Sequence, residues 1–286
     1  MTSPPAGFRR VVVGLPQSIA NPAAVSAAMD FAEFLNLELL AAFIADTSLD
    51  ALAGFPAARE LRILEREWQA IDPEEIARDI ERAAGFARSR FAEAAASRTI
   101  KTSFDVVTGA QAMAARIRAD DIVVVIEPSH PGERITRQFT GLLDAALDTA
   151  AAVLIMPRRI ARASGPVMAI AAAADDATIR VALELAAALR EDLIVLTRLG
   201  VFIPAALLAA ANALGVHLEQ AVTGQLFTDE SAWLSSPSRG KERLRVVARS
   251  RIPHDDVARL FSTLQGVPLL VIEPDRIAPE RQESVA

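Results

Sequence analysis

Short aliphatic runs alternate with longer amphipathic segments, and this alternation constrains the fold of the chain more than any other feature. A continuous aliphatic run of about four to eight residues is typical of a strand that is covered on both faces. Two parallel strands need a long crossover, usually a helix. The expected strands are 9–15, 37–45, 100–107, 121–127, 152–156, 167–174 and 192–199, and the expected helices are 22–35, 72–96, 110–118, 133–149 and 178–190. The pattern predicts an α/β protein with a doubly wound parallel sheet.

The same pattern restarts after a short basic connector at residues 158–165. Residues 28–35 match residues 182–189, and the strands that follow these two segments also match. Further along, residues 124–129 match residues 270–275. A repeat of this length indicates two copies of one domain.

We therefore predict two repeats of a doubly wound, parallel five-stranded sheet, with one domain at residues 1–160 and the other at residues 161–286. Only a polar tail follows Pro274, so we expect the second repeat to be truncated, without a last helix and strand. Residues 200–245 carry no clear pattern and are left unassigned.

Composition excludes several classes of protein. The formal net charge is −6, whereas a dedicated nucleic-acid binder usually carries a basic face. The absence of cysteine excludes disulfides and thiol catalysis and fits a reducing interior. No apolar stretch is long enough to span a bilayer, so we expect no membrane association and a cytoplasmic location.

Several segments carry a family resemblance. Four segments resemble a universal stress protein domain: the helix that contains Ala-Met-Asp-Phe-Ala at residues 28–32, the strand at residues 39–46, and the runs at 120–125 and 151–157. The resemblance implies an adenine-nucleotide α-hydrolase-like sheet that is often dimeric. It implies that two tandem copies would pack as an intramolecular pseudo-dimer. A homodimer or a protein partner is expected as well, through the sheet edge that a missing fifth strand would expose.

The resemblance also points to a nucleotide motif that this chain has largely lost. ATP-binding members carry an aspartate after the first strand, and here that position is Pro16. They also carry three spaced glycines and a Ser or Thr after the fourth strand, and glycine lets backbone amides approach phosphates. The three glycine positions fall on Ile126, Ser129 and Phe139, and only Thr140 keeps the family type. We expect no cofactor, and family-type ATP binding to be lost or much weakened.

The altered loop could instead hold another small molecule at the carboxyl end of the sheet, where open α/β sheets bind ligands. The candidate ligand-binding residues are Pro16, Ser129, His130, Arg134, Arg137 and Thr140. Glu127, His130 and Glu133 could form a metal or acid–base group. The plainer interpretation is a solvated loop in which Glu127 caps or forms a salt bridge, because the same Glu-Pro pair recurs at residue 273 without a histidine.

Other candidates have plain interpretations too. Arginines at 158, 159 and 162 could join Arg134 and Arg137 around an anion, but an arginine-rich chain has arginines over its whole surface. Trp68 and Trp233 are expected to pack.

The leading hypothesis is a universal stress protein-like, non-catalytic regulatory or interaction module. The alternative is a small-molecule or nucleotide-binding protein that uses the altered loop. A weak hydrolase based on Glu127 or His130 is a third hypothesis.

Overall fold

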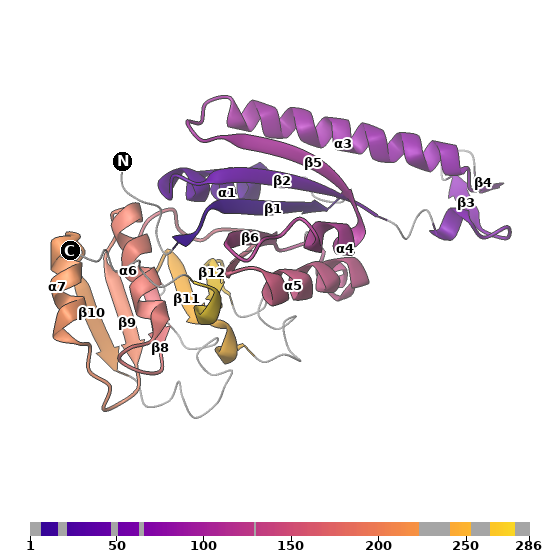
Figure 1. Cartoon of the computed structure of the whole chain (residues 1–286). Helices are drawn as coiled ribbons and strands as arrows, with labels where there is room; N and C mark the ends of the chain where they lie inside the picture. The colour runs from indigo at the N-terminus through magenta and orange to yellow at the C-terminus, as the bar shows by residue number, and fades with distance from the viewer. Residues whose placement is uncertain are drawn as a thin grey trace, which may run out of the picture.

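The computed structural model describes residues 7–16, 22–46, 51–62, 66–128, 130–222, 241–252 and 264–277. Ten strands form one sheet in the order β10-β9-β8-β11-β12-β7-β6-β1-β2-β5 (Figure 1). Helices pack on both faces of this sheet, as the doubly wound pattern predicts.

The first half of the sheet contains the five expected strands, all paired in parallel. These strands are β1 (Arg10–Pro16), β2 (Glu38–Ala45), β5 (Thr102–Thr108), β6 (Asp121–Ile126) and β7 (Ala152–Met156). The helices between them are α1 (Pro22–Phe34), α3 (Pro73–Ala95), α4 (Gly109–Ala114), the 3₁₀ helix η2 (Pro131–Ile135) and α5 (Arg137–Thr149). In β1, Val11 and Val13 face one core and Val12 faces the other, which explains why the run is aliphatic throughout.

The second half repeats this strand order with five strands of its own. They are β8 (Val167–Ala171), β9 (Leu193–Thr197), β10 (Leu218–Val222), β11 (Leu244–Ala248) and β12 (Leu269–Ile272). Its described helices are α6 (Ala177–Leu189), α7 (Ala205–Ala213) and the short 3₁₀ turns η3 (Arg249–Arg251) and η4 (Pro274–Arg276). The expectation that the second half lacks its fifth strand is therefore wrong.

The error arose from matching residues 270–275 to residues 124–129. That aliphatic run is β12, the fifth strand, and the fourth strand is β11. The hydrophobic pattern does not predict β11, because a charged residue, Arg245, interrupts the aliphatic run. In the structure Arg245 is buried, and its guanidinium lies 2.7 Å from the Glu242 carboxylate. A different match in the sequence aligns the two fifth strands correctly: Pro-Arg-Arg-Ile-Ala at residue 157 resembles Pro-Asp-Arg-Ile-Ala at residue 274.

The two halves are joined by an antiparallel pairing of their fifth strands, β7 and β12. Leu269 lies opposite Ile155 and Ile272 lies opposite Ala152. The two main cores extend across this junction, so both halves share the same packed layers. The packing of two tandem copies as an intramolecular pair stays a prediction. The domain boundary at residue 160 falls in the connection between β7 and β8 and stays a prediction.

A small projecting unit precedes α3. Strands β3 (Arg59–Arg62) and β4 (Glu67–Ala70) form an antiparallel hairpin. The hairpin lies beyond the amino-terminal end of α3, away from the main sheet (Figure 1). The start of α3 was predicted, and the Asp72 carboxylate accepts a hydrogen bond from the Glu74 amide at 2.9 Å. Trp68 does not pack as expected, because it lies on β4 and is 64% exposed. Trp233 lies outside the described residues.

Candidate functional site

The candidate site lies at the carboxyl ends of β1 and β6. These strands are neighbours, and the chain leaves them toward opposite sides of the sheet, which makes this the switch point where open α/β sheets bind ligands. Strand β1 ends at Pro16, which pairs with Ile44 of β2. Strand β6 ends at Ile126, which is 1% exposed and belongs to the core.

Both carboxylate oxygens of Glu127 have partners. One carboxylate oxygen forms an ion pair with the Arg134 guanidinium, and the other accepts a hydrogen bond from the Arg158 backbone amide at 2.7 Å. The Glu127 amide also donates to the carbonyl oxygen of Met156 at 2.8 Å. The salt bridge expected of Glu127 is confirmed, whereas the N-cap positions of η2 and α5 are His130 and Thr136. These contacts fasten the loop to the end of β7 and leave neither carboxylate oxygen without a partner.

The remaining acid–base candidates do not converge on Glu127. His130 is exposed and precedes η2 without a side-chain cap, while Ser129 lies outside the described residues. The Glu133 backbone is part of η2, where its carbonyl oxygen accepts a hydrogen bond from the Thr136 hydroxyl at 2.8 Å. Over the described ranges, no group of three or more histidine, aspartate or glutamate side chains could hold a metal ion.

Helix α5 places apolar side chains where the family motif has glycine. Phe139 is 5% exposed and packs in the core that contains Val12 and Val125. One turn later, Leu142 lies against Gly14 of β1, and a Cβ at Gly14 would meet the Leu142 side chain at 3.1 Å. Gly14 thus lets α5 approach the end of β1 closely, and the space beside the strand is occupied by protein.

The two polar candidates on α5 have local roles. The Thr140 hydroxyl donates a hydrogen bond to the carbonyl oxygen of Thr136 at 3.1 Å, within the first turn of the helix. Arg137 is exposed at the helix start. Of the predicted site residues, Arg134 forms an ion pair with Glu127, whose second oxygen accepts a hydrogen bond from the Arg158 amide. The Glu133 amide donates to the His130 carbonyl oxygen at 3.0 Å.

In the second half, the acids nearest to the family's aspartate position are Asp175 and Asp176. Asp176 is the N-cap of α6: its carboxylate accepts hydrogen bonds from the Thr178 amide at 3.0 Å and the Thr178 hydroxyl at 2.6 Å. Its second oxygen accepts from the Ala172 amide at 3.0 Å. Asp176 therefore shapes the turn after β8.

Two buried ion pairs were missed at the sequence level. Arg10 of β1 donates two hydrogen bonds to Asp121 of β6, at 3.0 and 2.7 Å, and Asp121 is fully buried. The hydrogen bond to Asp121 raises the pKa of Arg10 above its ordinary value. Arg245 and Glu242 form the corresponding pair at the start of β11. Both pairs lie at the amino ends of their strands, on the opposite edge of the sheet from the crevice. In the sequence, the feature that could have indicated these pairs is a charged residue next to an aliphatic run.

Comparison with solved structures identifies the architecture. A universal stress protein from Archaeoglobus fulgidus superposes with a TM-score of 0.61 at 12% identity, covering 92% of this chain and 96% of that one. The chain has the fold of the universal stress proteins. The Pseudomonas aeruginosa protein PA1789, of unknown function, gives a TM-score of 0.52 at 13% identity, covering 95% of both chains. A putative universal stress protein from P. aeruginosa UCBPP-PA14 gives a TM-score of 0.50 at 13% identity, covering 95% of this chain and 96% of that one.

The universal-stress-protein fold is supported here by structure alone. No protein-family profile matches the sequence, and no curated protein matches it significantly. Among the helices that the structure describes, none is long and apolar enough to cross a bilayer.

Proposed function

We propose that this chain is a non-catalytic, cytoplasmic regulatory or interaction module of the stress response, in which family-type ATP binding has been lost. The fold supports the family assignment, and the crevice at β1 and β6 supports the loss of nucleotide. The module acts through protein contacts, with a second copy or another protein as partner, and it uses no cofactor.

The observation that carries the proposal is the packing of α5 over the end of β1. Phe139 and Leu142 are 5% and 2% exposed, so their side chains take part in the core. A phosphate group would have to displace them, because Phe139 occupies the last glycine position of the family motif. Removing an aromatic side chain from a packed core costs about 3–5 kcal/mol in folding free energy. A bound nucleotide would have to offset this cost through its own contacts.

The test is calorimetric titration of the purified chain with ATP and AMP in the presence of magnesium, after bound nucleotide has been assayed. We expect no binding up to about 1 mM nucleotide, which corresponds to less than about 4 kcal/mol of affinity. Low-micromolar binding would refute the loss of ATP binding.

A variant pair then tests the cause. Phe139→Gly restores one glycine position of the motif, while Leu147→Ala removes a buried side chain of the same helix away from the crevice. ATP binding by Phe139→Gly, but not by Leu147→Ala, would show that the aromatic ring blocks the site. Equal behaviour of the two variants would mean that the ring at 139 is not the obstacle.

A further inference from the structure

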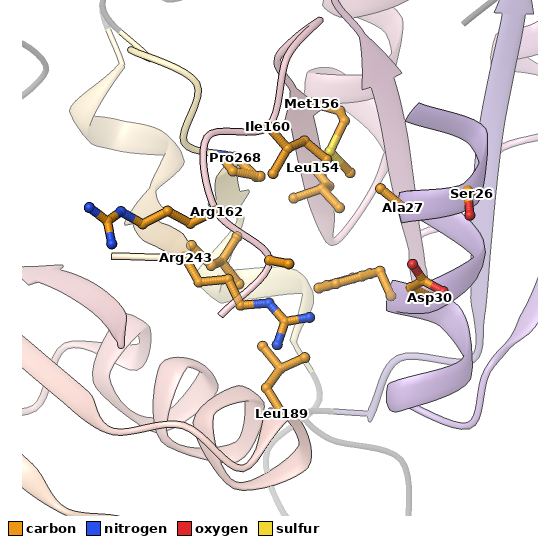
Figure 2. Close-up of a pocket in the computed structure, with 13 residues that line it drawn as sticks. Ser26, Ala27, Asp30, Leu154, Met156, Ile160, Arg162, Leu189, Arg243 and Pro268 are labelled. Carbon is orange, nitrogen blue, oxygen red and sulfur yellow. The ribbon is translucent and has the colours of Figure 1, made fainter. Parts of the chain in front are cut away.

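A second hollow in the molecule lies at the junction of the two halves. It is a cavity of about 370 Å³ between α1 of the first half and α6 of the second, over the end of β7 and the beginnings of β11 and β12 (Figure 2). The antiparallel pairing of β7 with β12 creates it, because the carboxyl end of one half meets the amino end of the other. The cavity shares no residue with the crevice at Pro16, Ile126 and Phe139.

The walls of the cavity are mainly apolar. Phe31 of α1, Leu154 and Met156 of β7, and Leu189 at the end of α6 all contribute, and each is at most 7% exposed. The volume lies in the range of small-molecule pockets, which are usually apolar with a few placed polar groups. An apolar molecular body of modest size therefore matches this space.

The main polar group of the cavity is the guanidinium of Arg243, just before β11. Figure 2 shows it between Leu189 and Asp30, while the Arg162 side chain extends away from the other labelled residues. The Arg243 side chain is 20% exposed, and its contact with Glu191 is 3.5 Å long, beyond the usual length of a charged hydrogen bond. It also lies over the Phe34 ring, 5.1 Å from its centroid. A guanidinium has five donors in a fixed fork, and these contacts use few of them.

The one carboxylate in the lining is already ion-paired. Asp30 forms an ion pair with Arg98 at 2.5 Å, and Arg98 also binds Glu33 at 2.9 Å. Asp30 is therefore already paired with an arginine other than Arg243. Arg162, at the rim, has no ion pair or hydrogen bond among the described residues, and the lining itself holds two arginines and one carboxylate.

We propose that the junction cavity binds a small amphipathic carboxylate, with its apolar body against Leu154, Met156 and Phe31 and its carboxylate on Arg243. The planar fork of arginine suits a carboxylate, and a partly desolvated site strengthens that bond. Because both halves supply the walls, bound ligand stabilises the paired arrangement of the halves. The proposal is independent of the nucleotide crevice and goes beyond the proposed function.

The experiment is calorimetric titration of the full chain with sodium decanoate, decan-1-ol and inorganic phosphate, each below its aggregation limit. Decanoate is expected to bind at least about tenfold more tightly than either the neutral alcohol or phosphate, because only decanoate uses both the wall and the arginine. Equal binding of decanoate and decanol would overturn the proposal, as would equal binding of phosphate or no binding of decanoate up to about 1 mM.

Matched variants locate the site. Arg243→Gln is expected to weaken decanoate binding about tenfold or more. Arg159→Gln, at an exposed arginine of the connector between β7 and β8 that does not line the cavity, should leave the binding unchanged. Ala27→Leu adds bulk to the cavity wall and is expected to abolish binding without removing a charge. It serves as the second test if Arg243→Gln folds poorly. Unchanged affinity in both Arg243→Gln and Ala27→Leu would refute the location.

Discussion

Asp121 contributes to stability through the charge that it neutralises. Its carboxylate is fully buried and receives two hydrogen bonds from Arg10 and one from the Arg118 amide at 2.7 Å. Asp121→Asn leaves the Arg10 guanidinium partly buried without its counter-ion, and we expect a loss of about 3 kcal/mol in the free energy of unfolding. Urea denaturation measures this change.

The neighbouring acid supplies the control. Asp120 pairs with Arg9 at 3.3 Å, but the two side chains are 40% and 79% exposed. Asp120→Asn should cost less than about 1 kcal/mol. Similar losses in Asp120→Asn and Asp121→Asn would show that burial of the pair is unimportant.

The ionised carboxylate of Glu33 should make the stability of the fold depend on pH, with a definite sign. Hydrogen bonds from Arg98 and Thr99 hold the pKa of Glu33 below its ordinary value. Stability from a lowered carboxyl pKa is present above the unfolded-state value, about 4.3, and is lost as the pH falls through the folded-state value. Glu33→Gln should therefore be less stable than the wild type at pH 7, and the difference should shrink below about pH 4. Thermal melts from pH 7 to pH 3 measure it, and a constant difference would contradict the assignment.

At the scale of single elements, the contact between α5 and β1 closes the crevice. Leu142 is 2% exposed and lies on Gly14, so Leu142→Ala leaves a cavity at this contact. The expected cost is about 2–5 kcal/mol by chemical denaturation. Leu208→Ala on α7, where the side chain is 43% exposed, is the control and should change stability by less than about 0.5 kcal/mol. A small loss in Leu142→Ala would mean that the end of β1 is loosely packed.

Periodicity predicts the buried elements well and the irregular ones poorly. The strands of the first half and the start of α3 at Asp72 were predicted, because aliphatic runs and an acidic cap leave clear marks. Strand β11 was missed because Arg245 breaks its run; the ion pair with Glu242, three residues earlier in the chain, makes that charge acceptable in the core. The β3–β4 hairpin was missed because its four-residue strands are polar and exposed. At the candidate site, the sequence suggested a cap or a salt bridge for Glu127 but could not show that its partner is Arg134.

At the scale of the whole molecule, the β7–β12 junction makes the two halves one structure. The pairing of distant strands leaves no local mark in the sequence, so the junction could be expected from the family resemblance but not located. Val271 of β12 is 2% exposed and lies opposite Val153 of β7. Val271→Asp buries an unpaired carboxylate at the shared core.

Hydrogen exchange tests this coupling. In Val271→Asp we expect amide exchange to accelerate in β1 and β8 together, since Val12 of β1 and Ile170 of β8 share a core cluster with Val271. Val222→Asp, on edge strand β10 with 52% exposure, should leave both strands protected. Faster exchange in β8 alone would show that the halves unfold independently.

The crevice of this universal-stress-protein fold is filled by the protein's own side chains. A crystal structure determined in the presence of ATP and magnesium tests this packing, because it shows the fold, α5 and any nucleotide at once. We expect Phe139 and Leu142 to pack over the end of β1 and no nucleotide to bind there. A nucleotide bound between β1 and β6, with α5 displaced, would contradict it.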